Sequence, residues 1–434
     1  MTESVSKDHF SKKERIILCC LYFLTFAWWL KTGLIQSNDS QGYLAMAPYR
    51  SLGYPLFIKI TTFFGLIDSY YSTSLIALIL QLFAIDRLIY FLKAQFKLSQ
   101  LSVVALAVIF VLPDFMFSVA NENMSECLAY PLFLISLHLL LKSLFNKSEK
   151  AAVTYFFSTM LLILVRAQFS SFYICSLLLI IYLVWHSKSK MKSALFLVSI
   201  FIISVLSITL SDRTYHLIFH NKFQPTEFTG CQLIVPALFN AQAKDSVLFK
   251  DPVQKGVFDT VMTELKKNEL YNFKFTKEYS EYTAVRYNHL YNFIVHQLVI
   301  KYIGNDLRKK GLKSTDIDYW NGIEKTTTPM AIALIKAHPL DYIKLYLCVF
   351  KASMGDWTFL IPFFIIFIFS VILFLVYKAR LAIFFIISSI LMFSNAALVC
   401  AVEEGMTRYL FYTYFTLIAV ISIALIKQFE NKPE

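Results

Sequence analysis

The sequence is poor in charged residues and in glycine for its length. Only 16% of its 434 residues are charged, whereas about 25% is usual for a soluble domain. Its eleven glycines form no loop that could hold the phosphates of a nucleotide, which argues against ATP or a nucleotide-sugar as donor. None of its seven cysteines shows a CxxC or zinc-ligand spacing. These shortages exclude a soluble enzyme, a disordered protein, a coiled coil and a disulfide-rich secreted domain.

What the sequence has in abundance is long apolar runs. Hydrophobic residues make up 57% of the chain, and ten runs are long enough, or nearly so, to cross a bilayer. The fifth run is short for a full span. The first is too long for the apolar core of a signal peptide, so we expect it to stay as an uncleaved helix. The ten runs are residues 16–34, 71–92, 101–120, 127–145, 152–165, 169–185, 192–210, 359–377, 381–401 and 409–426.

Basic residues exceed acidic ones, 41 to 29, and many of them stand in short loops between the apolar runs. No motif for binding nucleic acid accompanies them, so nucleic acid is not an expected partner. Short basic loops favour the cytoplasmic side of a membrane. With the N-terminus inside, alternation places four such loops inside together, at residues 93–97, 142–150, 186–192 and 378–380.

This topology predicts an all-α polytopic membrane protein with about ten transmembrane helices and a partly helical subdomain on the outer face. Three parts follow from it: a membrane module over residues 1–210, an extracytoplasmic helical segment over 211–358, and C-terminal membrane helices over 359–434. Residues 341–357 include Lys344, Lys351 and Asp356 and are interpreted as an interfacial helix. The sidedness is typical of a bacterial inner membrane, with the site facing the periplasm.

Unusual polar residues gather on the predicted outer side. Because polar groups at or within a membrane cost free energy, their presence there points to a function. Asp39 and Tyr43 are four apart and share a helix face. Arg50 and Lys59 follow, so a carboxylate beside an anionic ligand is one interpretation. The other is an ordinary helix start, capped by Ser37 or by Asn38, with interfacial side chains.

Three further positions on this side carry charge and leave two interpretations each. Glu126 begins a predicted helix, where it either favours the helix dipole or faces Asp39 as a second acid. Arg166 interrupts two apolar runs and either binds phosphate or reaches to the interface. Arg408 opens the last run and either pairs with Glu404 or binds phosphate.

Histidines of the long outer segment show no metal-pair spacing. We expect surface or packing roles for His216, His220, His289 and His296.

The order of these motifs resembles the GT-C superfamily of glycosyltransferases that use polyprenyl-phosphate sugars, above all its bacterial members related to protein mannosyltransferases and aminoarabinose transferases. Most of the resemblance lies in the first 170 residues, and the long outer segment carries none of it. The matching residues are Asp39, Tyr43, Ala47, Arg50, Gly53, Tyr54, Pro55, Pro113, Ser125, Glu126, Arg166, Arg408 and Tyr409.

The resemblance implies an inverting transfer of sugar from a polyprenyl-phosphate donor to a glycan, lipid or protein acceptor on the outer face. It implies Asp39 and Glu126 as catalytic acids and makes binding residues of Tyr43, Arg50, Tyr54, Lys59, Arg166, Arg408 and Tyr409. Membrane lipid is a further expected partner. Many relatives carry Asp-Glu where this chain has Asp39-Ser40, which weakens the case for a divalent metal. Asp39 with Glu126 could still hold one, so the metal stays open.

Two other functions compete with this one. A flippase or transporter of lipid-linked sugars would show paired repeats or broken helices, with polar residues near mid-membrane. An O-antigen polymerase or ligase would use a diphosphate donor carrying a whole glycan. The Asp-x-x-x-Tyr motif at Asp39 and Tyr43 argues against the second, through the resemblance alone.

Overall fold

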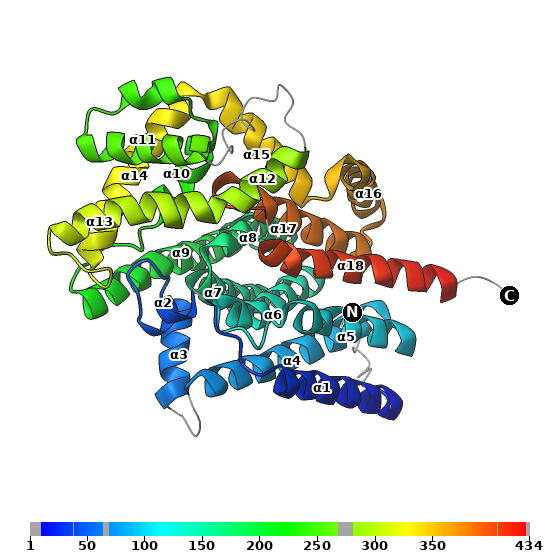
Figure 1. Cartoon of the computed structure of the whole chain (residues 1–434). Helices are drawn as coiled ribbons and strands as arrows, with labels where there is room; N and C mark the ends of the chain where they lie inside the picture. The colour runs from blue at the N-terminus through cyan, green and yellow to red at the C-terminus, as the bar shows by residue number, and fades with distance from the viewer. Residues whose placement is uncertain (1–9, 38, 64–68, 268–280, 406, 431–434) are drawn as a thin grey trace.

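The computed structural model describes residues 10–37, 39–63, 69–267, 281–405 and 407–430, and these ranges are almost wholly helical (Figure 1). In them the only β-type pairing is one isolated bridge between Ile35 and Glu122. The helices are α1 (Lys12–Thr32), α2 (Ser40–Leu44), α3 (Gly53–Phe63), α4 (Ser69–Phe96), α5 (Gln100–Phe117), α6 (Ser125–Asn146), α7 (Glu149–Val165), α8 (Phe172–His186), α9 (Lys190–His220), α10 (Thr229–Asn240), α11 (Pro252–Lys267), α12 (Glu281–Asn292), α13 (Lys301–Lys309), α14 (Ile317–Ala337), α15 (Pro339–Ser353), α16 (Asp356–Tyr377), α17 (Arg380–Val402) and α18 (Thr407–Glu430). Short 3-10 helices, η1 (Ala167–Ser171) and η2 (Ala243–Leu248), and the π-helix η4 (Phe293–Ile300) join them.

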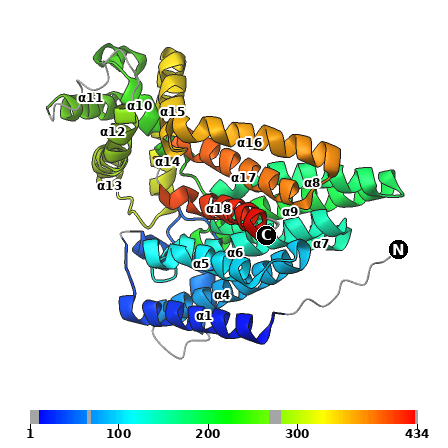
Figure 2. The same ribbon diagram turned by 90° about the vertical axis from the view of Figure 1, so that its right-hand side faces the viewer.

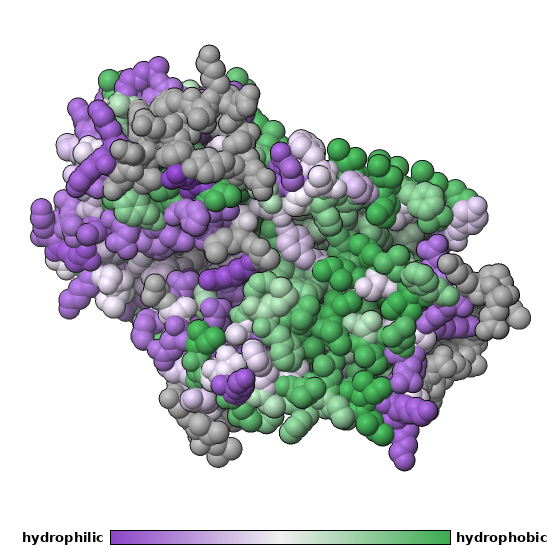
Figure 3. Space-filling view, turned by 45° about the vertical axis from the view of Figure 1, so that its right-hand side comes forward, coloured by the Kyte–Doolittle hydropathy of each residue, from purple (hydrophilic) through white to green (hydrophobic). Residues whose placement is uncertain are grey.

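Nine helices of the described chain are long and apolar enough to cross a membrane, which confirms a polytopic all-α protein. They are α1, α4, α5, α6, η1 with α8, α9, α16, α17 and α18. The remaining run of the ten, 152–165, folds into α7, a helix of 17 residues that packs between α6 and α9. Its standing as a tenth span stays a prediction. A broad hydrophobic surface covers the long helices in Figure 3, between two ends that are more hydrophilic.

The four basic loops lie together at one end of these helices, as alternation predicts. Arg380, in the loop before α17, donates to the side chain of Gln95 at the end of α4, at 2.9 Å. Lys147, His186 and Lys378, from the other connections, line a single cavity. The start of α1 reaches the same end, because Lys93 of α4 forms a 2.6 Å ion pair with Glu14. Which side of a membrane this end faces remains an expectation.

Helices α10 to α15 gather at the opposite end around a hydrophobic core of their own (Figure 2). This core is built from Ile234, Phe258, Val295, Ile323 and many others. The helix α9 continues past the expected boundary at residue 210 and ends at His220, so the segment separates from the membrane helices later than the apolar pattern indicates.

The helix α15 has the properties expected of an interfacial helix, but it ends at Ser353, so the predicted end at residue 357 is wrong: Asp356 already begins α16. It runs across the direction of α16 in Figure 2 and is not among the candidate spans of the described chain. Leu345 and Val349 are buried in the second core, while Leu340, Ile343 and Leu347 form an exposed apolar face on the other side. That face can rest on a bilayer while the buried face carries the segment above it.

Candidate active site

The first loop places Asp39 directly before α2. The helix begins at Ser40, and the side chain of Asp39 makes no capping hydrogen bond to it. Instead its Oδ1 accepts from Nη2 of Arg50 at 2.6 Å, and 41% of the Asp39 side chain stays exposed. The interpretation of Ser37 as the cap is wrong, since its hydroxyl contacts that of Ser40 at 3.3 Å. Asn38 lies outside the described residues.

Glu126 lies one residue inside α6 and joins two arginines that are far apart in the sequence. Its Oε1 is 2.6 Å from Nη1 of Arg166, which follows α7, and 2.7 Å from Nε of Arg408, which opens α18. The Glu126 side chain is only 3% exposed. The anion that Arg166 requires is therefore a carboxylate of the chain itself.

Tyr43 and Ser125 connect these two groups. The Tyr43 hydroxyl donates to Oγ of Ser125 at 3.1 Å and accepts from Nη1 of Arg50 at 3.4 Å. Nη1 of Arg166 reaches the same Ser125 oxygen at 3.4 Å. Arg408 links the two carboxylates, because it contacts Glu126 and its Nη2 is also 3.9 Å from Oδ2 of Asp39. We call this set the arginine–carboxylate ring; its members are Asp39, Tyr43, Arg50, Ser125, Glu126, Arg166 and Arg408.

Two aromatic residues support the ring. The aromatic side chain of Tyr409 faces both guanidinium groups: its centroid is 5.2 Å from Cζ of Arg166 and 5.6 Å from Cζ of Arg408. Such cation–π contacts hold a guanidinium without neutralising it. Tyr54 is fully buried and packs edge-on against Tyr43, with ring centroids 4.9 Å apart. Tyr409 and Tyr54, both expected as binding residues, therefore lie next to the arginine–carboxylate ring: Tyr409 contacts two of its arginines, and Tyr54 packs against Tyr43.

Two of the sequence interpretations change with these contacts. Lys59 does not join the arginine–carboxylate ring. Its ammonium lies over the phenyl group of Phe219 on α9, 4.9 Å from the centroid. Arg408 does not form its ion pair with Glu404, because the side chain of Glu404 accepts from Asn292 at 3.1 and 3.2 Å. Packing between distant helices thus overrides a pairing that spacing along one helix favours.

The ring carries excess positive charge. Three arginines face two carboxylates, which leaves a net charge of +1. Burial opposes the charged form of Arg50, yet Tyr43 and Asp39 outweigh it and hold the pKa of the guanidinium above its ordinary value.

Three more carboxyl groups lie within electrostatic reach of the ring. Burial raises the pKa of Glu122 and of Glu403, and it raises that of Glu404 to about 7. Arg408 acts against burial at each of them, but burial is the larger cause. Because burial favours their neutral forms, these acids offset the excess positive charge less than free carboxylates would.

The acids present do not fit a divalent cation. Among the described residues, no three His, Cys, Asp or Glu side chains converge in a way that could hold a metal. Asp39 and Glu126 are each engaged by guanidinium groups, which already supply the positive charge that a cation would bring. We therefore derive no step through a metal.

Some residues near the ring escape sequence reasoning. Asn395 of α17 and Gln168 of η1 both donate to the carbonyl of Tyr409, at 3.0 and 3.1 Å. Asn395 carried a signal, since it is a polar residue inside an apolar run. His296 carried none: its side chain is exposed on η4, outside the second core, and lies within electrostatic reach of Asp39 and Arg50.

Gly53 allows the first loop to approach Arg166 closely. A Cβ at Gly53 would stand 2.6 Å from the backbone nitrogen of Val165 and 2.7 Å from the carbonyl carbon of Leu164. Backbone atoms cannot move aside as a flexible side chain can. The glycine thus sets the distance between α3 and the stretch of chain that carries Arg166.

Gly53→Ala is therefore expected to destabilise the protein by about 1–3 kcal/mol, the usual cost of overpacking, and to displace Arg166. Thermal unfolding in detergent measures the first effect, and the activity proposed below measures the second. Ser51→Ala is the control, because it adds no atom to the same loop. Equal stability of the two variants would show that the contact is not tight.

Comparisons of the chain with models of protein families, with curated proteins and with solved structures find no match. The arginine–carboxylate ring and its place in the fold are thus the grounds on which a function is assigned.

Proposed function

We propose that this protein is an inverting glycosyltransferase that moves a sugar from a polyprenyl-phosphate donor to a glycan, lipid or protein acceptor at the outer face of a membrane. The observation that carries the proposal is an exposed carboxylate, Asp39, held against two arginines of a ring with a net charge of +1. A phosphodiester of this kind carries one negative charge, which the ring can balance. Its polyprenyl tail would remain in the bilayer beside the long apolar helices.

The chemical step requires a base and a place for the leaving charge. Asp39 takes the proton of the acceptor hydroxyl, whose oxygen then forms a bond to the anomeric carbon of the sugar. The bond from that carbon to the phosphate oxygen breaks, and polyprenyl phosphate leaves with the electron pair. One displacement inverts the anomeric centre. Developing negative charge on the phosphate is stabilised by guanidinium groups already in place.

Burial divides the roles within the ring. The Asp39 and Arg408 side chains are 41% and 33% exposed and can meet substrate. Those of Glu126 and Arg166 are 3% and 12% exposed. We assign the base to Asp39 and the phosphate contact to Arg408, and we assign to Glu126 the task of holding the two arginines.

The position of the charges favours an enzyme over a transporter. The ring is built from the first turns of α6 and α18 and from the junction after α7, which are helix ends. Transporters place their substrate site near the middle of the bilayer, between repeated halves. A site at one end suits a reaction between a lipid-borne donor and an acceptor outside the hydrocarbon layer.

Deletion of the gene tests the proposal directly. We expect cell-surface glycans to lose the mass of one sugar, or of a side branch, while the polyprenyl-phosphate sugar accumulates. The purified protein given that accumulated lipid and the surface-glycan acceptor of the deletion strain should release polyprenyl phosphate. Movement of the lipid across vesicles without release of polyprenyl phosphate would support a flippase instead.

Arg408→Ala is expected to lower kcat/KM for the donor about 10²- to 10³-fold, the usual loss when one group that stabilises a leaving charge is removed. Initial rates at varied donor concentration measure this. Arg308→Ala on α13 is the matched control, since Arg308 is exposed and contacts Asn305 of its own helix. A donor kcat/KM unchanged by Arg408→Ala would remove Arg408 from the phosphate site.

A further inference from the structure

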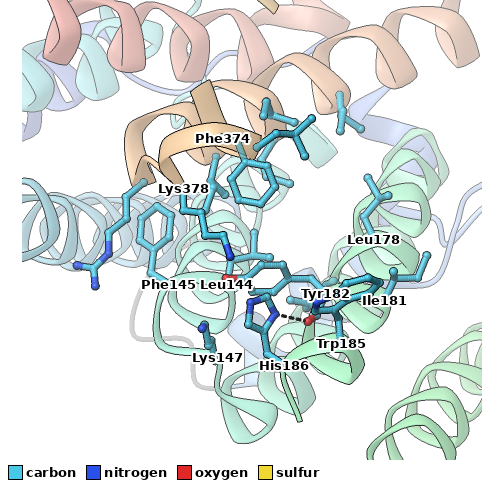
Figure 4. A pocket seen from close by; sticks show the side chains of 17 residues that line it. Leu144, Phe145, Lys147, Leu178, Ile181, Tyr182, Trp185, His186, Phe374 and Lys378 are labelled. Atoms are coloured by element: carbon cyan, nitrogen blue, oxygen red, sulfur yellow. Dashed lines mark hydrogen bonds between the residues drawn. The ribbon is translucent and has the colours of Figure 1, made fainter. Parts of the chain in front are cut away.

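A cavity of about 600 Å³ opens at the end of the long helices opposite to the arginine–carboxylate ring (Figure 4). It lies between the last turns of α6, α8 and α16 and the first turns of α17. Its volume falls within the range of about 300–1,000 Å³ that is usual for ligand pockets. The walls are mostly apolar and include Leu178, Leu179, Ile181, Phe374 and Ile387.

One rim of this cavity is basic. Lys147, His186, Lys378 and Arg380 line it, and none of the lining residues, all of which are described, is acidic. Figure 4 shows the side chains of Lys147, His186 and Lys378 at the same end of the hollow. The cavity therefore pairs an apolar interior with a cationic mouth.

The charges of two lysines at this rim are not used within the described chain. Neither the ammonium of Lys147 nor that of Lys378 has an ion-pair or hydrogen-bond partner there, whereas Arg380 is held by Gln95. The acid nearest to Lys147 in sequence, Glu149, is bound by the hydroxyl of Ser193. Each lysine follows the end of a helix, where a cation is favourable. That explains the lysines but not the apolar hollow beside them.

The cavity is open toward the side of the helices that faces lipid. Trp185, Ile181 and Leu375 line it and are 74%, 62% and 68% exposed, although they belong to candidate membrane spans. Trp185 lies in the last turn of α8 beside the basic loop, the level at which tryptophan is enriched at membrane interfaces. An acyl chain can thus enter from the bilayer while its headgroup stays at the rim.

We propose that this cavity binds an anionic glycerophospholipid of the adjoining leaflet, with an acyl chain in the hollow and the phosphate at Lys147 and Lys378. Basic pockets between membrane helices are recognised sites for such headgroups. The charge complementarity selects an anionic lipid over a zwitterionic one. The site does not depend on the glycosyl transfer proposed above, because it lies at the other end of the helices.

Native mass spectrometry of the full chain tests this proposal. Phosphatidylglycerol and phosphatidylcholine with identical acyl chains are offered in equal amount to the detergent-purified protein. We expect about a fivefold or greater preference for phosphatidylglycerol in the first bound lipid, because the quaternary ammonium of phosphatidylcholine cancels the attraction of its phosphate to the two lysines. Lys147→Ala with Lys378→Ala should remove that preference.

Lys188→Ala with Lys192→Ala is the matched control, because it removes two exposed lysines at the same end that do not line the cavity. The preference should survive it. An equal loss in both double variants would show diffuse surface attraction and overturn the proposal. Stronger binding of a polyprenyl phosphate than of phosphatidylglycerol would overturn the stated occupant.

A second measurement needs no change at the rim. Phosphatidylglycerol with brominated acyl chains should quench the fluorescence of Trp185, which lines the cavity. Subtraction of the signal of Trp185→Phe isolates this residue from the other tryptophans. Absence of a Trp185 component in the quenching would place the lipid elsewhere and overturn the proposal.

Discussion

Asp39→Asn is expected to lower transfer about 10²- to 10⁴-fold while leaving the fold intact, because general-base catalysis contributes that much and an amide cannot accept the proton. The substitution keeps the size of the side chain and one oxygen that Arg50 can still bind. The Asp39 side chain is 41% exposed and that of Arg50 is 18% exposed, so this ion pair is less buried than that of Glu126 with Arg166, and loss of its charge costs less stability. Turnover by the purified variant, with the donor that accumulates in the deletion strain, measures the effect.

Asp306→Asn provides the matched control for this change. Asp306 of α13 forms a surface ion pair with Lys310, the residue after the helix, and such pairs contribute little to stability. We expect its transfer rate to stay within about twofold of the unmodified protein, as for a surface change without a role in the site. Near-normal turnover by Asp39→Asn, with both variants eluting as folded protein, would exclude Asp39 as the base.

Glu126→Gln is expected to destabilise the protein by about 3–5 kcal/mol, the usual cost of removing one partner from a buried ion pair. Arg166 then keeps its charge with 12% of its side chain exposed and no carboxylate to balance it, and Arg408 loses the acid bound to its Nε. Transfer should fall as well, because both arginines lose their fixed orientation. Denaturant titration in mixed micelles measures the unfolding free energy.

A double-mutant cycle separates this ion pair from a general effect of polarity. Arg166→Gln and the double variant Glu126→Gln with Arg166→Gln complete the cycle. We expect the double variant to lose less unfolding free energy than the two single variants lose together. The difference should be about 0.5–3 kcal/mol, the range for residues in direct contact. Additive losses would mean that the two charges do not interact, and the roles assigned to the ring would have to be revised.

The arrangement of the ring explains why one acid is exposed and the other buried. Glu126 is surrounded by Arg166, Arg408 and Ser125 and has no open side from which substrate could approach. Asp39 meets the same network from the loop before α2 and keeps part of its carboxylate in the open. The sequence does not distinguish Asp39 from Glu126 as candidate catalytic acids. Their different burial assigns the catalytic role to Asp39 and the positioning role to Glu126.

The membrane helices were largely predictable from sequence. Hydrophobicity over about 20 residues is a local property, and a bilayer of fixed thickness requires it of each span. The run at 381–401 therefore corresponds to α17 to within one residue at each end, and the run at 71–92 lies inside α4, which is two residues longer at its start and four at its end. The common end of the four basic loops followed as well, since alternation of spans leaves each loop only two choices.

The helices of the segment from α10 to α15 were much harder to place. Their apolar faces are covered by one another rather than by lipid, so hydropathy does not mark them out. The continuation of α9 to His220 shows the same limit, because its last turns are less apolar than the span before them. Only packing shows where the membrane helix ends and the second core begins.

By itself the sequence determined the fold class, the apolar spans, the shared end of the basic loops and the candidate site residues. These follow from composition and spacing, which are local properties of the chain. The tertiary structure decided which charges meet. Arg408 pairs with an acid 282 positions away and not with Glu404 four positions before it. Contacts of that kind depend on how helix ends are packed together, and no short-range pattern encodes them.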